Sequence, residues 1–330
     1  MDDLLWPAST LPLTDDCHHY TERCDVPWDI QKYWSQRYHI YPNYDDGIYL
    51  TDDAWFGVTP QPIAQKIADN LAPPPGVSDD RAVLIDLFAG AGGNTVAFAL
   101  SGRWARVIAI EQDAATLACA QNNAVVCGVP DGAITWVHAD CFAVLDRLLG
   151  RQRRSALDPA LRVDPAHAVI FASPPWGGIS YRDQPVFDLS TMEPYNLETL
   201  HAACRPLPHA LYLPRTSDLQ QIADVARGDK AKRNKKGNSS EDEDDDDDND
   251  QENDNGRYHK HIEVVQYCIR GASKALVAYY PAATATTTTS TSTTTNGTIS
   301  NGTAAAACLR QTQEHGEGRD RRPGKRFKLR

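Results

Sequence analysis

Short apolar runs alternate with amphipathic stretches between residues 82 and 172. Apolar, β-branched runs of roughly four to eight residues predict buried strands, whereas apolar positions spaced three and four apart predict helices. On this basis we expect strands over 82–88, 106–111, 134–140 and 167–172, with helices over 96–100 and 114–124. Strands that alternate with helices indicate an α/β fold around a parallel sheet.

The last two apolar runs, 262–267 and 275–280, are joined by a short connection near Gly271. A connection this short fits antiparallel strands, because parallel neighbours need a crossover of about a dozen residues or more. We therefore expect a mostly parallel sheet that is closed by an antiparallel hairpin.

An aromatic and polar segment, 28–75, precedes the first predicted strand. Within it we expect two short helices, over 30–38 and 60–71, the second capped by Thr59. A proline-rich stretch then marks the boundary to the core. The predicted organisation is a flexible terminus over 1–27, a small helical module over 28–75 and a core over 76–281.

The net charge of −11 comes from one segment of the chain. Eleven acidic residues lie between Glu241 and Asp254, so the remainder is neutral overall and an RNA substrate stays compatible with the composition. The charge density of 229–255 predicts a disordered surface insertion, because so few apolar groups cannot offset the entropy of ordering. The Thr/Ser/Ala-rich tail over 282–330 is also expected to be disordered, with a basic end that suits nuclear import or RNA tethering.

The sequence shows no pattern typical of a membrane span, a leader segment or a zinc site. No stretch approaches the ~20 apolar residues of a membrane span. The amino terminus lacks a basic and then apolar leader pattern, so we expect an intracellular protein. Eight cysteines spread along the chain fit reduced thiols. Cys17, His18, His19 and Cys24 match no common zinc spacing, and no metal is expected.

The most specific motif is Ser-Pro-Pro-Trp-Gly-Gly at 173–178, directly after the predicted strand 167–172. Two prolines stiffen the backbone there and remove amide donors, so that carbonyl oxygens are left to face a ligand. A planar base with an exocyclic amine can donate to Ser173 and to the carbonyl of Pro174 while its ring stacks on Trp176. The motif therefore indicates methylation of a nitrogen on a purine or pyrimidine.

Three other predicted strands each end close to a carboxylate, namely Asp86, Glu111 and Asp140. Asp86 precedes a turn with Gly90 and Gly92, where the backbone can approach a ligand closely. A dinucleotide fingerprint needs a third glycine, but Thr95 stands at that position. A carboxylate beside such a turn suits a cationic amino-acid head, Glu111 suits ribose hydroxyls and Asp140 suits an adenine amine. Although any one acid could instead cap a helix, together they predict S-adenosylmethionine as cofactor.

These motifs resemble a known family. The run 86–99 resembles the first motif of class I S-adenosylmethionine-dependent methyltransferases, and 32–280 is similar to the trimethylguanosine synthase family, which methylates guanine N2 of the 7-methylguanosine RNA cap. The matching blocks are 32–38 with 44–48, 55–60, the glycine turn through Thr95, 173–178 with Tyr181, and 213–215. The resemblance implies a Rossmann-like class I methyltransferase fold, with a seven-stranded sheet and a helical module that covers the cofactor.

The same resemblance implies roles for individual residues. The cap and its phosphates would contact Lys32, Ser173, Pro174, Trp176, Tyr181 and Arg215. The cofactor would be held by Thr59, Asp86, Phe88, Gly90, Gly92, Glu111, Gln112, Asp140, Cys141 and Pro175. The implied product is the 2,2,7-trimethylguanosine cap of small nuclear and nucleolar RNAs, made in the nucleus or nucleolus by a monomer whose partners include small ribonucleoprotein proteins.

Two other functions stay open. A nitrogen methyltransferase for adenine or cytosine in RNA or DNA could use a similar Pro-Pro-aromatic motif, although it gives no reason for the block 32–47. An inactive cap-binding module could keep Trp176, although the retained acids and glycines argue against it. Within the preferred function, N7 methylation makes the base cationic, which strengthens its stacking on an indole. No general base can be named from the sequence.

Overall fold

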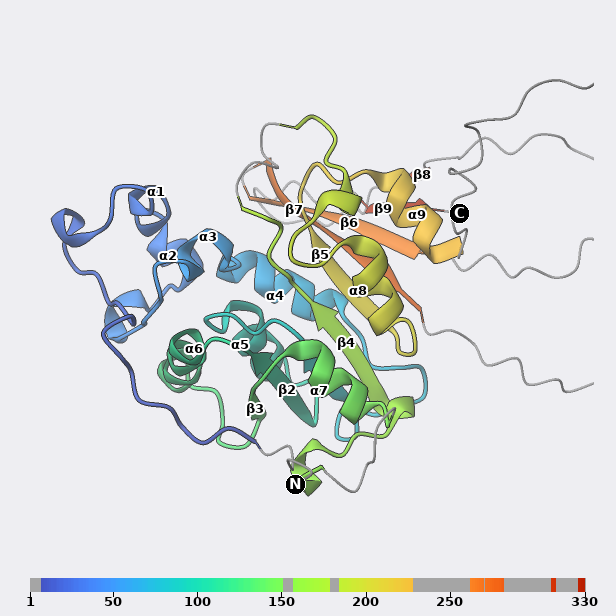
Figure 1. Cartoon of the computed structure of the whole chain (residues 1–330), viewed down its shortest axis with the longest axis horizontal. Coiled ribbons are helices and arrows are strands. Elements are labelled where there is room, and N and C mark those ends of the chain that lie inside the picture. Colours follow the sequence, from blue (N-terminus) through green and yellow to red (C-terminus); the bar gives the residue numbers. More distant parts are fainter. Residues whose placement is uncertain are drawn as a thin grey trace, which may run out of the picture.

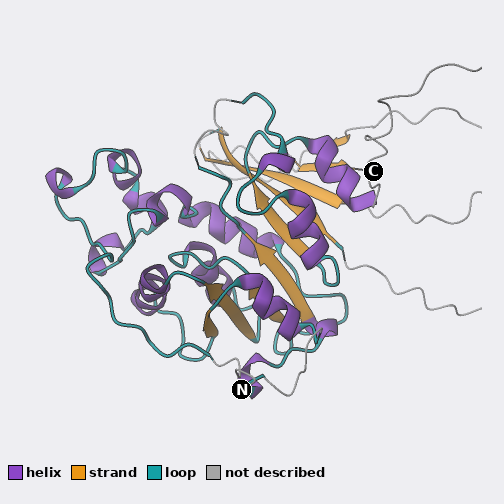
Figure 2. Cartoon of the chain, in the orientation of Figure 1, coloured by secondary structure: helices purple, strands orange, loops and turns teal. Residues whose placement is uncertain are grey.

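The computed structural model describes residues 7–150, 157–178, 184–227, 262–269 and 271–281, together with the backbone of 310–312 and 326–329. In this part of the chain a central sheet carries helices on both faces, and the small helices of the amino-terminal module lie to one side of it (Figures 1 and 2). The acidic insertion expected over 229–255 and the residue Tyr181 lie outside the described residues.

Seven strands form the expected sheet, in the order β3-β2-β1-β4-β5-β7-β6. Their bounds are β1 Val83–Asp86, β2 Arg106–Glu111, β3 Ile134–His138, β4 Ala168–Ala172, β5 His209–Leu213, β6 Ile262–Ile269 and β7 Ala272–Tyr280. Strands β1 to β5 pair in parallel, and β7 runs antiparallel to both β5 and β6. The mostly parallel seven-stranded sheet with its closing hairpin is therefore confirmed. The strand order reverses between β1 and β4, and ligands of open α/β sheets bind outside the carboxyl ends of the strands at such a point.

Helices and short 3₁₀ turns cover the two faces of the sheet. The bounds are α4 Gln61–Asn70, α5 Gly93–Leu100, α6 Ala114–Val126, α7 Cys141–Leu148, α8 Leu197–Cys204 and α9 Leu219–Arg227, with 3₁₀ turns at Pro159–Leu161, Pro165–His167 and Leu189–Thr191. All four residues of β1 are buried, as expected for a central strand covered on both sides. Its alternate side chains divide between two cores: Val83 and Ile85 pack with α7 to α9, and Leu84 packs with α4 and α5.

The amino-terminal module consists of one-turn helices around an aromatic core. They are α1 Gln31–Trp34, α2 Arg37–Ile40 and α3 Ala54–Gly57, with 3₁₀ turns at Arg23–Asp25 and Tyr44–Asp46. Where one helix over 30–38 was predicted, the structure has two, because the Ser35 hydroxyl donates to the carbonyl of Gln31 (2.7 Å) and competes with the continuing helix. The buried module residues Ile48 and Trp55 pack in the same cluster as Ala91 and Cys119 of the core.

The segment before this module is packed on the core. The amide of Ala8 donates to the carbonyl of Trp136 (2.7 Å), and the amide of Leu11 donates to Oε1 of Gln121 (2.8 Å). Cys17 is buried in the module's apolar cluster. The described residues of 1–27 thus differ from the flexible terminus that composition predicted, since backbone groups far apart in sequence bind one another there.

Two strands come from the range that was predicted to be a disordered tail. They are β8 Arg310–Thr312 and β9 Arg326–Leu329, and β9 pairs antiparallel with β6. Strand β6 ends the seven-stranded sheet, and an edge strand presents unpaired amides and carbonyls to any passing chain. Composition alone gives no sign of this pairing. None of the described helices has the length and apolar character that a membrane crossing needs.

Candidate active site

The glycine turn between β1 and α5 is fixed by a carboxylate from the neighbouring strand. Gly90 and Gly92 adopt positive φ angles of 53° and 96°, which other residues adopt only with strain. Oε2 of Glu111, at the end of β2, accepts a hydrogen bond from the amide of Gly90 (2.9 Å). Its Oε1 accepts from the amides of Gln112 (2.9 Å) and Asp113 (3.0 Å). Glu111 therefore holds the turn as well as standing at the predicted ribose position.

Asp86 lies beneath this turn and is fully buried. Its Oδ2 accepts a hydrogen bond from the Thr95 hydroxyl (2.7 Å), and its Oδ1 accepts a longer one from the amide of Phe88 (3.4 Å). Burial raises the pKa of Asp86 to about 7, and the nearby charge of Glu111 acts in the same direction. Because a cation beside such a carboxylate favours its ionised form, the pair of Asp86 and Glu111 suits a positively charged ligand group.

A second polar group at the turn has an unmet hydrogen bond. Nδ2 of Asn94 donates to the Thr59 hydroxyl (3.0 Å), whereas the buried Oδ1 of the same amide has no partner among the described residues. A Cβ added to Gly93 would lie 3.1 Å from the carbonyl oxygen of Thr59, a tight contact that would require the segment at Thr59 to shift by a few tenths of an ångström. The segment around Thr59 thereby reaches the start of α5. Thr59 is not the helix cap predicted for it, because Pro60 precedes the first residue of α4 and no side chain caps that helix.

Asp140 and three aromatic rings lie together after β3. Oδ1 of Asp140 accepts from the amide of Ala143 (2.9 Å) and caps α7, so the helix-cap role is realised. Its Oδ2 accepts a 3.4 Å hydrogen bond from the Tyr195 hydroxyl. The Tyr195 ring meets Phe142 edge-on, with centroids 4.6 Å apart, and lies 5.9 Å from Phe88. A carboxylate beside aromatic faces matches the predicted adenine position.

These groups together fit S-adenosylmethionine. The described side chains around the turn offer acceptors, namely the carboxylates of Asp86, Glu111 and Asp140 and the free Oδ1 of Asn94. The ligand carries the matching donors, which are an ammonium group, two ribose hydroxyls and an adenine amine. A pyrophosphate would instead be repelled by three carboxylates. Within the described ranges, no three His, Cys, Asp or Glu side chains are grouped so as to hold a metal ion.

The Ser-Pro-Pro-Trp motif follows β4, the strand next to β1. Asp86 stands opposite Phe171 in the parallel register, and the amide of Leu87 donates to the carbonyl of Phe171 (3.0 Å). Ser173 is thus only two residues beyond the partner of Asp86. Neighbouring strands lie about 4.8 Å apart. The predicted cofactor acid and the predicted substrate motif therefore leave the sheet side by side.

Trp176 is half-buried and contributes to the core. Its ring is nearly parallel to that of Tyr212, with centroids 5.7 Å apart and 10° between the planes, and its Nε1 donates to the Tyr212 carbonyl (3.3 Å). Within the motif, Pro174 is buried, Ser173 is half-buried and Pro175 is exposed. The indole therefore has a structural role in addition to any contact with a base.

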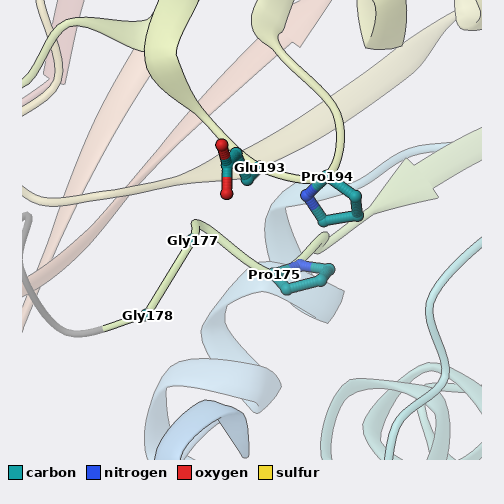
Figure 3. Close-up of a pocket in the computed structure, with 5 residues that line it drawn as sticks. All are labelled: Pro175, Gly177, Gly178, Glu193 and Pro194. Atoms are coloured by element: carbon teal, nitrogen blue, oxygen red, sulfur yellow. The ribbon is translucent and has the colours of Figure 1, made fainter.

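An open pocket of about 570 Å³ lies at the motif, lined by Pro175, Gly177, Gly178, Glu193 and Pro194 (Figure 3). Two segments form it: the motif itself, and the loop between the 3₁₀ turn Leu189–Thr191 and α8. The pocket stands at the edge of the sheet where the sequence placed the substrate.

Four other residues predicted for the site do not line this pocket. Lys32 is exposed on α1 and Arg215 is exposed after β5, and neither side chain has a hydrogen bond or ion pair within the described part of the chain. Gln112 is exposed, with its carbonyl bound to Nε2 of His138 (3.0 Å). Cys141 is buried in the main core, and burial raises the pKa of its thiol to about 12.

Five residues of this region were not predicted as site residues: Asn94, Thr95, Phe142, Glu193 and Tyr195. Thr95 offered a signal, since it occupies the place of the third glycine in a dinucleotide fingerprint. Asn94 precedes it in the same turn, and Phe142 follows the predicted Cys141. Glu193 and Tyr195 gave none, because they lie in an irregular loop between a 3₁₀ turn and α8, where the sequence has no periodic pattern.

The sequence profile described as "RNA cap guanine-N2 methyltransferase" matches residues 81–283. The chain is 34% identical over 200 residues to trimethylguanosine synthase of Schizosaccharomyces pombe, a match that spans 60% of this chain and 76% of that protein. It is 30% identical over 200 residues to trimethylguanosine synthase of Saccharomyces cerevisiae, spanning 59% of this chain but only 58% of that protein. Among solved structures it is similar to a SAM-dependent methyltransferase from Agrobacterium tumefaciens, with 15% identity and a TM-score of 0.39 over 68% of this chain and 63% of that one.

Proposed function

The chain belongs to the RNA cap guanine-N2 methyltransferase family, and from this membership we propose that it converts the 7-methylguanosine cap of small nuclear and nucleolar RNAs into the 2,2,7-trimethylguanosine cap. Methyl transfer from S-adenosylmethionine to guanine N2 is the activity of the family. For this chain we add three points to that activity: the class of RNA, the nuclear location and the addition of two methyl groups.

The proposed cofactor site is the turn between β1 and α5 with the ends of β2 and β3. S-adenosylmethionine carries its methyl group on a positively charged sulfur, and the neutral thioether that remains after transfer is a good leaving group. Asp86 and the free Oδ1 of Asn94 would bind its ammonium group, Glu111 its ribose and Asp140 its adenine amine. Phe88, Phe142 and Tyr195 would shield the adenine ring from water.

The proposed substrate site is the Ser-Pro-Pro-Trp motif. Trp176 would stack on the 7-methylated guanine, whose positive charge adds about 0.5–2 kcal/mol to stacking on an indole. The carbonyl of Pro174 and the hydroxyl of Ser173 would accept hydrogen bonds from the N2 amine and so aim its lone pair at the methyl group. As the N–C bond forms, the S–C bond breaks, S-adenosylhomocysteine leaves, and one N2 proton passes by way of Ser173 to water. The protein mainly supplies proximity and orientation, which can lower a barrier by about 7–11 kcal/mol.

The observation that carries the proposal is the register of the two central strands. Asp86 of β1 is paired with Phe171 of β4, so the acid of the cofactor turn and the motif beginning at Ser173 emerge from adjacent strands. This arrangement supports a methyl donor and a planar base meeting over the carboxyl edge of the sheet. Methyl transfer to 7-methylguanosine triphosphate, compared with uncapped RNA and with DNA oligonucleotides, tests it. Transfer only to adenine or cytosine would instead identify the other class of nitrogen methyltransferase.

A further inference from the structure

An acidic side chain with no assigned role lines the pocket at the motif. Glu193 and Pro194 form one side of the pocket, and Pro175, Gly177 and Gly178 form the other (Figure 3). The carboxylate is exposed and has no hydrogen bond or ion pair in the part of the chain that the structure describes. The other four lining residues are prolines and glycines, so no basic group among them offsets its charge.

The residues next to Glu193 in the chain are packed, and its Cβ faces the motif. A Cβ built on Gly177 would lie 3.4 Å from Cβ of Glu193, which is van der Waals contact, and the φ of Gly177 (+79°) is one that favours glycine. On one side of Glu193, Met192 is buried in the main core. On the other side, Tyr195 packs edge-on against Phe142. The backbone of Glu193 is therefore held between packed residues, and its Cβ lies beside the Trp-Gly-Gly turn.

The charge of the pocket selects among ligands. An ionised carboxylate only accepts hydrogen bonds, and it does so most strongly from donors on a cation. Guanine presents N–H donors at N1 and N2, and methylation at N7 adds a positive charge to the same ring. The unmethylated base has the donors without the charge. A carboxylate beside the ring therefore favours the methylated base over the unmethylated one.

We propose that Glu193 is a specificity-determining residue that accepts a hydrogen bond from N1–H at the edge of the base and distinguishes 7-methylguanine from guanine by its charge. The proposal rests on the proposed function, because it takes the base in this pocket to be the cap guanine. It adds a second source of selectivity to the stacking of Trp176, one that acts through the edge of the ring instead of its face.

The test measures dissociation constants for 7-methylguanosine triphosphate and guanosine triphosphate, with S-adenosylhomocysteine present. The variants are Glu193→Gln, which keeps the shape and removes the charge, and Glu193→Asp, which keeps the charge on a shorter side chain. Glu198→Gln is the matched control, since Glu198 is an exposed acid in the first turn of α8 and outside the pocket lining. Melting temperatures of all variants establish that they are folded.

We expect Glu193→Gln to weaken binding of the methylated nucleotide about tenfold and of the unmethylated one by less than about twofold, in line with the strength of charge-assisted hydrogen bonds. Glu193→Asp should retain part of the preference and Glu198→Gln all of it. A Glu193→Gln protein that keeps the wild-type preference, or that weakens for both nucleotides equally, overturns the inference alone. A wild-type protein with no affinity for the methylated nucleotide overturns the proposed function as well.

Discussion

The indole of Trp176 lies almost parallel to the ring of Tyr212, with 5.7 Å between centroids, and its Nε1 donates to the Tyr212 carbonyl. Trp176 thus packs against a residue of β5 and stands between Pro175 and Gly177, two residues that line the pocket. A change at this position alters both stability and function, and the two effects can be separated by the choice of substitution.

Trp176→Ala should lower methyl transfer to a capped substrate at least about a hundredfold. It should also lower the free energy of unfolding by about 1–3 kcal/mol, less than a fully buried tryptophan because Trp176 is only half-buried. This second effect follows from the half-buried position of the indole and its contact with Tyr212, which the motif alone does not reveal. Single-turnover rates and urea unfolding measure the two effects. Trp176→Phe, which keeps an aromatic face, should recover most of the stability and part of the rate; near-normal transfer by Trp176→Ala would refute the stacking role.

Thr95 should matter to the cofactor through Asp86. Thr95→Val keeps the shape but removes the hydroxyl that donates to Oδ2 of Asp86, and we expect it to weaken S-adenosylhomocysteine binding about three- to tenfold. Asp86→Ala should weaken binding about tenfold or more, on the scale of the ~1.5–3 kcal/mol of a hydrogen bond to a charged group. Calorimetric titration gives both values. Thr95→Ser serves as the control that retains the hydroxyl, and equal affinity in all these proteins would leave Asp86 with a structural role only.

Stability should depend on pH through Asp86. Burial raises the pKa of Asp86 from 3.8 to about 7 in the folded protein. Between these values the folded state still holds a proton that the unfolded state has lost, so the free energy of unfolding should fall as the pH rises from about 4 to about 7. Asp86→Asn cannot ionise and should show a flatter profile across this window. Urea unfolding at stepped pH measures the difference between the two proteins, and identical profiles would contradict the assigned shift.

Asn123 should connect the amino-terminal module to the glycine turn. This buried amide donates from Nδ2 to the carbonyls of Tyr49 (2.8 Å) and Ala91 (3.0 Å), and its Oδ1 accepts from the amide of Tyr49 (2.9 Å). Asn123→Ala leaves the amide and the carbonyl of Tyr49 unpaired, which should cost about 1–3 kcal/mol of stability, whereas the Ala91 carbonyl keeps its hydrogen bond from the Tyr41 hydroxyl (2.9 Å). Because Ala91 belongs to the glycine turn, cofactor affinity should fall too. Asn122→Ala, which removes one donor to Gly47 at the module's surface, is a milder control.

Replacement of 229–255 by a short Gly/Ser link should preserve turnover. For a connection without regular structure, the closure free energy changes by only about 0.6 kcal/mol per twofold change in length. Carboxylates repel RNA phosphates over roughly 8–10 Å at physiological salt, and this segment carries eleven acidic residues. The deletion should therefore either lower the Michaelis constant for capped RNA at low ionic strength or leave that constant unchanged. Loss of activity in a folded deletion protein would place the segment within the site.

The sheet was predictable because each of its central strands is a short apolar run with an acid or a proline at its end. Strand β2, at Arg106–Glu111, matches its predicted bounds, and β4 begins at Ala168, one residue later than predicted. These strands are buried on both faces, so their local pattern and their tertiary position agree. The packed segment before residue 28 and the pairing of β9 with β6 were not predictable, since long-range backbone hydrogen bonds leave no periodic pattern in composition.

Some features of the candidate site could likewise be predicted from the sequence, and others could not. Asp86, Glu111 and Asp140 could be found because each lies at the end of a strand or within two residues of it. Their hydrogen bonds could not be found, although two of these acids have a second role through them, since Glu111 fixes the amide of Gly90 and Asp140 caps α7. Glu193 and Tyr195 lie in an irregular loop, where only the folded chain brings them to the motif.

The central claim is that this chain methylates guanine N2 of a 7-methylated cap at the edge shared by β1 and β4. Its most direct test is to incubate the protein with 7-methylguanosine-capped RNA, an unmethylated-cap RNA and S-adenosylmethionine, and to identify the product nucleoside by mass spectrometry. We predict one and then two methyl groups on N2 of the 7-methylated cap alone. Methyl groups on adenine or cytosine, equal transfer to the unmethylated cap, or no transfer by a folded, cofactor-binding protein would contradict the claim.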